Sequence, residues 1–395
     1  MDSRERVGRA MRHETPDRVP VMCQLALGHY LLHSRHAPPE IWFDSDVFAR
    51  VLIQFQEQYG FDGILVNLPG RPDNWRSYLR QRRAGATGEE LVWDAGVTTR
   101  FVPDDNPQAD DGSGQALPRA DYLRVDPDDP ATYRTAGYVW NTWHAPHLWD
   151  VPVTADLTDA AQWPAWSTRT LQRARTLAPR VSVHAEVFSP FTHLMELFGY
   201  ENALLALLDA PGTCHALLEV FTRMVRAQLQ TYLDADPDAI LISSAFAGAG
   251  FISRPIYAEF VLPYERRVAE RASAEGVPVY THTCGAIGDR LDLMERTGID
   301  GIDTLDPPPL GTVDLEQAKA EYGDRLFFKG NLDAVHEMLY ADEARFEQAV
   351  RQRITIGGPG SGYILSSACS VSPHVRPERL RRMTALAVEF GQYPR

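Results

Sequence analysis

The sequence has few cysteines, no long apolar run and no excess of positive charge, and each absence excludes a class of protein. Four cysteines in 395 residues are too few for the disulfide framework of a small secreted domain. No apolar run approaches the ~20 residues of a membrane span, and segment 1–21 lacks the apolar core of a secretory signal. The net charge of −14 disfavours nucleic acid and anionic membranes as partners, because both attract clustered cations. We therefore expect a soluble protein in the reducing cytoplasm.

Length and composition fit a single α/β domain over residues 1–395. Hydrophobic residues make up 44% and charged residues 23%, as in globular proteins with a sizeable core. Short apolar runs alternate with segments of helical periodicity, and these runs are 19–27, 62–68, 181–188, 239–246, 277–284, 298–305, 326–332 and 362–369. Apolar strands separated by helices predict a parallel sheet covered by helices. Eight such units favour a TIM (β/α)8 barrel, with an open doubly wound sheet as the alternative.

Residues 69–180 interrupt this alternation of strands and helices after the second predicted strand, because the segment is far longer than one helix. They contain a polar, glycine-rich stretch at 103–118 and an aromatic stretch that includes Trp140, Trp143 and His144. Such a long insertion is either a surface addition with its own small core or a lid over the barrel mouth. The aromatic stretch contributes to a site only if the insertion is a lid.

Two potential metal ligands end the fifth predicted strand. In VPVYTHTCG, His282 and Cys284 are two residues apart, so both face one side of the strand, which can be the barrel interior. Cys369 ends the eighth strand, and Asp303 and Asp306 end the sixth. The C-terminal strand ends of a barrel meet at one rim, so these side chains are expected to converge. One imidazole and two thiolates favour zinc, and three firm ligands with a displaceable fourth are typical of a catalytic site.

The opposing interpretation is that these cysteines are buried as small apolar side chains. The sequence has no C-x-x-C pair, so a structural zinc module is not supported. The position of all three residues at strand ends favours the metal. Cys23 in mid-strand and Cys214 in a helical segment are interpreted as core residues.

Further polar residues at strand ends are candidates for the lining of a pocket. Glu186 and Asn331 are the candidate catalytic residues, and Glu186 could orient a ligand or bind a substrate amine. The candidate substrate-binding residues are His184, Lys329, His29 and Tyr30. The alternatives are a structural His184/Glu186 pair and, for Asn331, turn formation or helix capping.

Six segments of the chain carry a resemblance to a known superfamily: RERVGRAMRHETPDRVPV, FSPFTHLMELFGYENALLALLDAP, FISRPIYAEFVLPYERRVAE, THTCG, GNLD and ILSSACSVSP. They resemble the uroporphyrinogen decarboxylase superfamily, and within it the zinc-dependent methyltransferases that move methyl groups between corrinoids and thiols, such as methylcobamide:coenzyme M methyltransferases. The resemblance covers most of 1–68 and 181–395. Cobalamin-independent methionine synthase is similar in its H-x-C…C spacing, with an acidic ligand in between.

The resemblance implies a TIM barrel in which His282, Cys284 and Cys369 bind Zn²⁺. Asp306 is the nearest match to the acidic ligand, with Asp303 as the alternative. The implied cofactors are Zn²⁺ and a corrinoid (cobalamin) as methyl donor. The candidate partners are a small-molecule thiol, a corrinoid protein and a second copy of the chain in a homodimer.

Two segments depart from the decarboxylase pattern. The arginine-containing segment that holds the tetrapyrrole corresponds here to MCQLALGHYLLHS, with no arginine before Arg35. The acidic residue common at the end of the fourth strand is missing from ISSAFAGAGF at 242–251. We therefore expect an enzyme that transfers a methyl or other alkyl group to a thiol activated as a zinc thiolate. The alternatives are a metal-free lyase for a carboxylated substrate and a non-catalytic corrinoid- or tetrapyrrole-binding protein.

Overall fold

A parallel β-sheet in the order β1-β6-β7-β8-β9-β10-β11 forms the centre of the molecule. The computed structural model describes residues 1–85, 88–135, 149, 151–152 and 154–394, so Trp140, Trp143 and His144 lie outside the described residues. The strands are β1 (Gly63–Val66), β6 (Ser182–Phe188), β7 (Ala239–Ser243), β8 (Val279–His282), β9 (Gly301–Thr304), β10 (Phe327–Leu332) and β11 (Tyr363–Ser367). Each of them lies within a predicted apolar run.

The first predicted strand closes this sheet into a barrel. Residues 19–25 lie between β11 and β1, because the Met22 N–H donates to the Leu365 carbonyl (3.1 Å) and the Asp62 N–H donates to the Val21 carbonyl (2.7 Å). Val21 and Leu365 also pair in parallel. Both edges of the sheet therefore pair with one segment, which confirms the TIM barrel and excludes the open doubly wound sheet.

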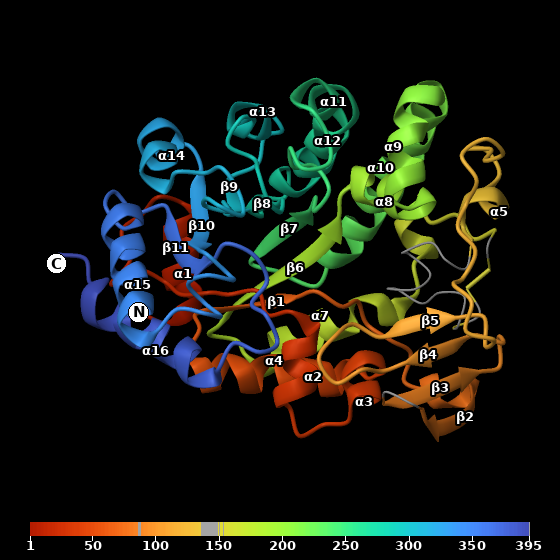
Figure 1. Ribbon diagram of the computed structural model, residues 1–395, viewed down its shortest axis with the longest axis horizontal. Helices are drawn as coiled ribbons and strands as arrows, with labels where there is room; N and C mark the ends of the chain where they lie inside the picture. The colour runs from red at the N-terminus through yellow and green to blue at the C-terminus, as the bar shows by residue number, and fades with distance from the viewer. Residues whose placement is uncertain (86–87, 136–148, 150, 153, 395) are drawn as a thin grey trace.

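The described helices lie around the barrel, except the first, which closes its N-terminal end, and the short helix 130–133, which belongs to segment 69–180 (Figure 1). They are α1 (Ser3–Met11), α2 (Leu27–His33), α3 (Pro38–Phe43), α4 (Ser45–Tyr59), α5 (Pro130–Tyr133), α7 (Arg169–Leu177), α8 (Pro190–Phe198), α9 (Tyr200–Asp209), α10 (Pro211–Leu233), α11 (Arg254–Phe260), α12 (Leu262–Ser273), α13 (Leu291–Glu295), α14 (Leu315–Tyr322), α15 (Glu343–Gly357) and α16 (Pro377–Phe390). Among the described residues, no single helix has the length and apolar character of a membrane span; α9 and α10 meet that test only as a pair bent by 117°.

An apolar floor closes the N-terminal end of the barrel. Helix α1 contributes Val7, Ala10 and Met11, whose spacing places them on one helix face. They belong to one cluster with side chains of the surrounding strands, which are Met22, Leu65, Ala239, Leu241, Tyr280, Phe327 and Ile364. The interior above this floor, at the C-terminal ends of the strands, is where a barrel holds its functional site.

The segment 69–180 contains a second sheet of antiparallel strands, β2 (Leu79–Ala84), β3 (Glu89–Trp93), β4 (Thr98–Arg100) and β5 (Gln108–Asp110). Figure 1 shows this sheet beside the barrel. Helix α7 at the end of the segment packs against α4, as a barrel helix does. Asp104 contacts His374 beyond β11 (2.8 Å), and the Ala120 N–H donates to Leu197 of α8 (3.2 Å). The insertion therefore touches two sides of the C-terminal rim, and its role as a lid stays a prediction.

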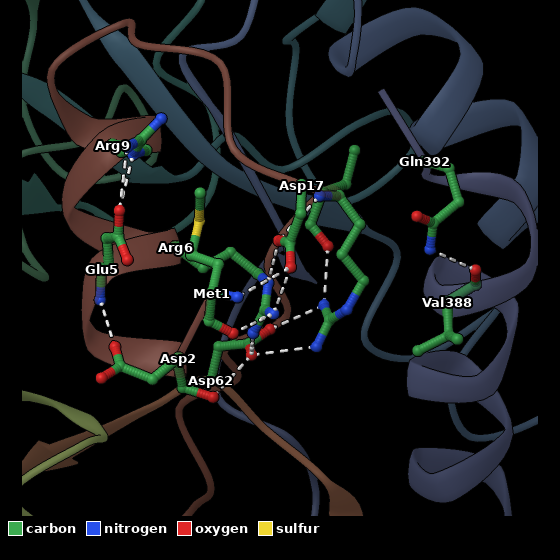
Figure 2. A network of polar contacts seen from close by, with 12 residues as sticks. Met1, Asp2, Glu5, Arg6, Arg9, Asp17, Asp62, Val388 and Gln392 are labelled. Carbon is green, nitrogen blue, oxygen red and sulfur yellow. Dashed lines mark hydrogen bonds and ion pairs between the residues drawn. The ribbon is translucent and has the colours of Figure 1, made fainter. Parts of the chain in front are cut away.

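Asp62 anchors the closing segment and helix α1 (Figure 2). Its carboxylate is fully buried and accepts hydrogen bonds from Arg6 Nη1 (2.7 Å), Arg18 Nη1 (2.8 Å) and the Val21 N–H (2.8 Å). Two guanidinium groups compensate the buried charge, and the bond to Val21 holds the first strand against β1.

We expect Asp62→Ala to lower the free energy of unfolding by about 3–5 kcal/mol, because it leaves two largely buried arginines without their shared partner. Urea unfolding followed by circular dichroism measures the loss. The matched control is Asp17→Ala, which removes a carboxylate that also binds Arg6 but is 41% exposed, and it should cost about 1 kcal/mol or less. Equal losses for the two variants would contradict this account of barrel closure.

Candidate metal centre

His282, Cys284 and Cys369 come together at the C-terminal rim of the barrel. Cys284 Sγ lies 3.5 Å from His282 Nε2 and 3.6 Å from Cys369 Sγ. One ligand atom from each residue lies within 4.8 Å of the other two. His282 is 4% exposed, and both cysteines are partly exposed. The convergence expected from the strand ends is therefore present, and its occupant stays a prediction.

Glycines allow the loops that carry these residues to approach each other. Gly285, directly after Cys284, has φ +77°, a backbone conformation that side chains with a Cβ rarely adopt. A Cβ at Gly248 would lie 2.6 Å from the Cys284 carbonyl oxygen, so a side chain there would push the loop after β7 away. The Ala249 N–H donates to the Ala286 carbonyl (2.7 Å) and fixes this contact.

Asp303 orients His282 from the neighbouring strand. Its Oδ2 lies 3.1 Å from His282 Nδ1, and its Oδ1 accepts a hydrogen bond from Lys329 Nζ at 2.9 Å. Burial opposes ionisation of Asp303, but the charge of Lys329 and the bond from His282 outweigh it and lower its pKa to about 2. This carboxylate holds Nδ1 as the donor and leaves Nε2 facing the two sulfurs, as behind many metal-binding histidines.

Contacts among the three candidate ligands, and with Asp303, shift the pKa values of all three. The hydrogen bond that the Cys284 thiol donates to Cys369 lowers the pKa of Cys369 well below its ordinary value and raises that of Cys284. Burial alone would lower the pKa of His282, but its bond to Asp303 and the neighbouring Cys369 charge raise it to about 10. These contacts favour the charged forms of Cys369 and His282. A metal ion that replaced the protons of this group would meet a neutral imidazole and two thiolates.

Neither acidic residue proposed as a fourth ligand joins this group. Asp306 Oδ2 accepts the Gly285 N–H (2.7 Å) and so supports the loop after Cys284. Burial raises the pKa of Asp306 to about 6 despite that bond. The group of mutually close ligand atoms contains neither Asp306 nor Asp303, within the residues that the structure describes. Neither carboxylate is placed against the three ligand atoms, and the role of Asp306 or Asp303 as a fourth ligand stays a prediction.

Three predicted substrate-binding residues are buried among other side chains, and a role in substrate binding stays a prediction for each. His184 is 0% exposed, and its ring nitrogens contact Ser182 Oγ (3.0 Å) and Tyr280 Oη (2.8 Å), so its partners are residues other than Glu186. His29 is also 0% exposed and lies 2.8 Å from Tyr59 Oη, on the outer side of the barrel wall. Tyr30 packs edge-on against Phe48 and Phe55 in the outer core.

Lys329, the fourth of these residues, does face the barrel interior. It is 1% exposed, and its ammonium group is paired with Asp303. It therefore supports the histidine ligand through Asp303 and offers no free charge to a substrate. Cys23 and Cys214 are 4% and 0% exposed and lie outside the ligand group, as expected for core residues.

The inner wall above the apolar floor is polar all the way around. On the six strands that contribute to the floor, the inward position two residues further along carries a polar side chain, because alternate residues share a face. Glu186 and Asp303 are the polar inward residues of β6 and β9, which contribute no residue to the floor. These residues, which we call the polar ring, are Gln24, Asn67, Glu186, Ser243, His282, Asp303, Lys329 and Ser366. Gln24, Asn67, Ser243 and Ser366 were not predicted from the sequence. The signal for them is a polar residue within VMCQLAL, ILVNL, AILIS or YILSS, which are otherwise apolar runs.

Glu186 is a partly exposed member of the polar ring. Burial raises its pKa to about 7, against the opposing influence of the neighbouring His282. Asn331, the next inward residue after Lys329, donates from Nδ2 to the Leu305 carbonyl (2.9 Å), and its Oδ1 is buried without a hydrogen-bond partner. Both residues lie inside the barrel, and their catalytic roles stay predictions.

The fold and the site define a (β/α)8-barrel protein with a candidate metal centre at the C-terminal rim. The Uroporphyrinogen decarboxylase (URO-D) family profile matches residues 151–390, more than half of the chain. The chain belongs to this family. It is 32% identical over 178 residues to uroporphyrinogen decarboxylase of Thioalkalivibrio sulfidiphilus, which covers 44% of this chain and 48% of that protein. The match to the Alkalilimnicola ehrlichii enzyme is 31% over 188 residues, 47% of this chain and 49% of that protein.

The chain thus spans about half the length of the curated relatives that it matches. A solved structure, a methyltransferase from Methanosarcina mazei, has the same fold over the whole chain. Its TM-score is 0.69 at 15% identity, and the alignment covers 99% of both chains. The shared barrel therefore includes residues outside the part matched by the family profile.

We expect Asp303→Asn to weaken zinc binding by ~10–100-fold, because it removes the carboxylate that orients His282. Competition with a chromophoric chelator measures the affinity. Asp300→Asn is the matched control, since Asp300 lies just before the same strand and instead accepts the Val279 N–H (2.8 Å). The double variant Asp303→Asn/Lys329→Met avoids a buried unpaired ammonium. Unchanged zinc affinity in this folded double variant would refute the orienting role.

Proposed function

We propose that this protein is a zinc-dependent transferase that moves a methyl or other alkyl group to a small-molecule thiol. The observation that carries this proposal is the cluster of one imidazole and two cysteine sulfurs with no fourth protein ligand in the described group. Zinc sites closed by four protein ligands are usually structural, whereas three ligands and an open position are typical of catalysis. The open position would accept the thiol.

The residues present fit a zinc ion. Imidazole and thiolate donors form a borderline-soft set that zinc prefers to the hard oxygen-binding cations. Neighbouring groups also hold two of the ligands in place, since Asp303 orients His282 and Asp306 holds the loop after Cys284. When bound, zinc would supply the Lewis acidity that keeps a substrate thiol deprotonated near neutral pH.

The protein's own residues prepare this reaction. Cys284 and Cys369 act as ligands and not as nucleophiles, because both are directed at the same point. Lys329 balances the charge of Asp303, so this pair adds no net charge beside His282. The substrate sulfur attacks the alkyl carbon, the bond between that carbon and its carrier breaks, and the electron pair leaves with the carrier.

Aromatic side chains beside the rim support an alkyl donor with a large face for stacking, and we propose a corrinoid. Tyr200 of α9 and Phe246 of the loop after β7 have ring centroids 4.8 Å apart, and Phe251 packs against Phe246 at 5.4 Å. Tyr200 is 47% and Phe251 41% exposed. This loop also contacts the loop after Cys284. A planar macrocycle that stacked there would lie next to the zinc group.

A decarboxylase is the second candidate, because the curated relatives carry that name. A substrate with several carboxylates needs cations in the pocket. Of the polar ring, Lys329 is the permanently charged cation, and Asp303 already neutralises it. The inner wall therefore favours thiol alkylation over the binding of a polycarboxylate.

Cysteine variants test the proposal. The purified protein should contain about one zinc per chain, and Cys284→Ser and Cys369→Ser should lose it by elemental analysis, since each removes one of three ligands. Both variants should also lose the thiol-dependent demethylation of methylcobalamin, which visible absorption follows, by at least ~100-fold.

Cys23→Ser and Cys214→Ser are matched controls that should keep both zinc and activity, because these residues lie outside the group. Demethylation by a zinc-free protein would contradict the proposal. A cobalamin spectrum that shifts without product formation would instead indicate a binding protein.

A further inference from the structure

The polar ring holds one carboxylate without an ion-pair partner among the described residues. Asp303 is paired with Lys329 and His282, whereas Glu186 is hydrogen-bonded to Ser243 and lies near the charges of His282 and Lys329 without pairing with either. Unlike that fully buried pair, Glu186 is partly exposed at the inner wall. A carboxylate that is largely removed from water without a counter-charge is costly unless a ligand supplies the charge.

Two other side chains of the inner wall also present acceptor atoms without a hydrogen-bond partner. The bond from Asn331 Nδ2 to the Leu305 carbonyl fixes the orientation of the amide, so its unpartnered oxygen is an acceptor. Asn331 is 1% exposed and faces inward. Gln24 Oε1 is a second buried acceptor without a partner. An ammonium group, with three donors and no acceptor, complements such a wall, whereas an anion does not.

The strand register places Glu186 within reach of a ligand that binds at the zinc group. Glu186 pairs with Leu241 on β7, and Leu241 pairs with Tyr280 on β8. Glu186 therefore lies two strands away from His282 and one inward position below it. Strand spacing and rise separate the two backbones by roughly 12 Å, and both side chains point inward and shorten that gap. A short aliphatic chain can join a sulfur at the metal to an amino group at Glu186.

We infer that the thiol substrate is an aminothiol whose ammonium group is bound by Glu186. This inference rests on the proposed thiol alkyltransferase function and narrows its substrate class. The zinc ligands then select the sulfur, and Glu186 selects the charge at the other end of the molecule. Thiols with a carboxylate in place of the amine would meet the unpaired charge of Glu186 and be rejected.

Calorimetric titration of the zinc-loaded protein tests the inference without any alkyl donor. The probes are cysteamine, which is cationic, mercaptoethanol, which is neutral, and mercaptoacetate, which is anionic. Wild-type protein should bind cysteamine at least ~10-fold more tightly than mercaptoethanol and mercaptoacetate most weakly, as expected for one charge-assisted contact. Glu186→Gln should lose the preference for cysteamine and keep its affinity for mercaptoethanol.

The comparison of wild type with Glu186→Gln cancels the difference in thiol acidity between the probes. Glu265→Gln is the matched control and should behave as wild type, because Glu265 is a fully buried carboxyl on α12 that no ligand reaches. Unchanged zinc content and circular dichroism establish that the Glu186 variant is folded. Equal affinities for all thiols, tighter binding of mercaptoacetate, or a preference that survives in Glu186→Gln would overturn the aminothiol. Failure of every thiol to bind would overturn the proposed function itself.

Discussion

The parallel register from β8 to β11 is the constraint on which the candidate site depends. Each pairing aligns an inward residue of one strand with an inward residue of the next, as His282 with Asp303 and Asp303 with Lys329. A shift of one residue in any strand would turn its side chain into the outer core. Segment 19–25 pairs with both β11 and β1, and Asp62 holds it there. The strand ends at the rim therefore keep fixed relative positions.

Three carboxylates near the site have different roles because their surroundings differ. Asp303 is ionised beside Lys329 and orients His282. Asp306 accepts a backbone N–H and shapes the loop that carries Cys284. Glu186, without a cation, remains available to a ligand. A carboxylate therefore orients a histidine, supports a loop or stays available to a ligand, depending on the group that it contacts.

In the proposed function, two sides of the barrel mouth recognise different parts of the substrate. The proposed sulfur-binding side consists of side chains from β8, β11 and their loops, whereas Glu186 comes from β6, on the other side of β7. The aromatic residues Phe246 and Phe251 lie on the loop that connects these regions at the rim. A barrel allows this arrangement because every strand end contributes to one mouth, and different loops can recognise different parts of the reactants.

The sequence alone determined the barrel, its strands and the convergence of His282, Cys284 and Cys369, because apolar runs mark strands and an i, i+2 spacing marks a shared face. It could not assign Asp303, Asp306 and Lys329 their partners, nor separate the buried His29, Tyr30 and His184 from residues that face a ligand. Those distinctions depend on register between strands and on which side of the wall a residue lies. Both are decided by packing between segments far apart in the chain, which only the tertiary structure contains.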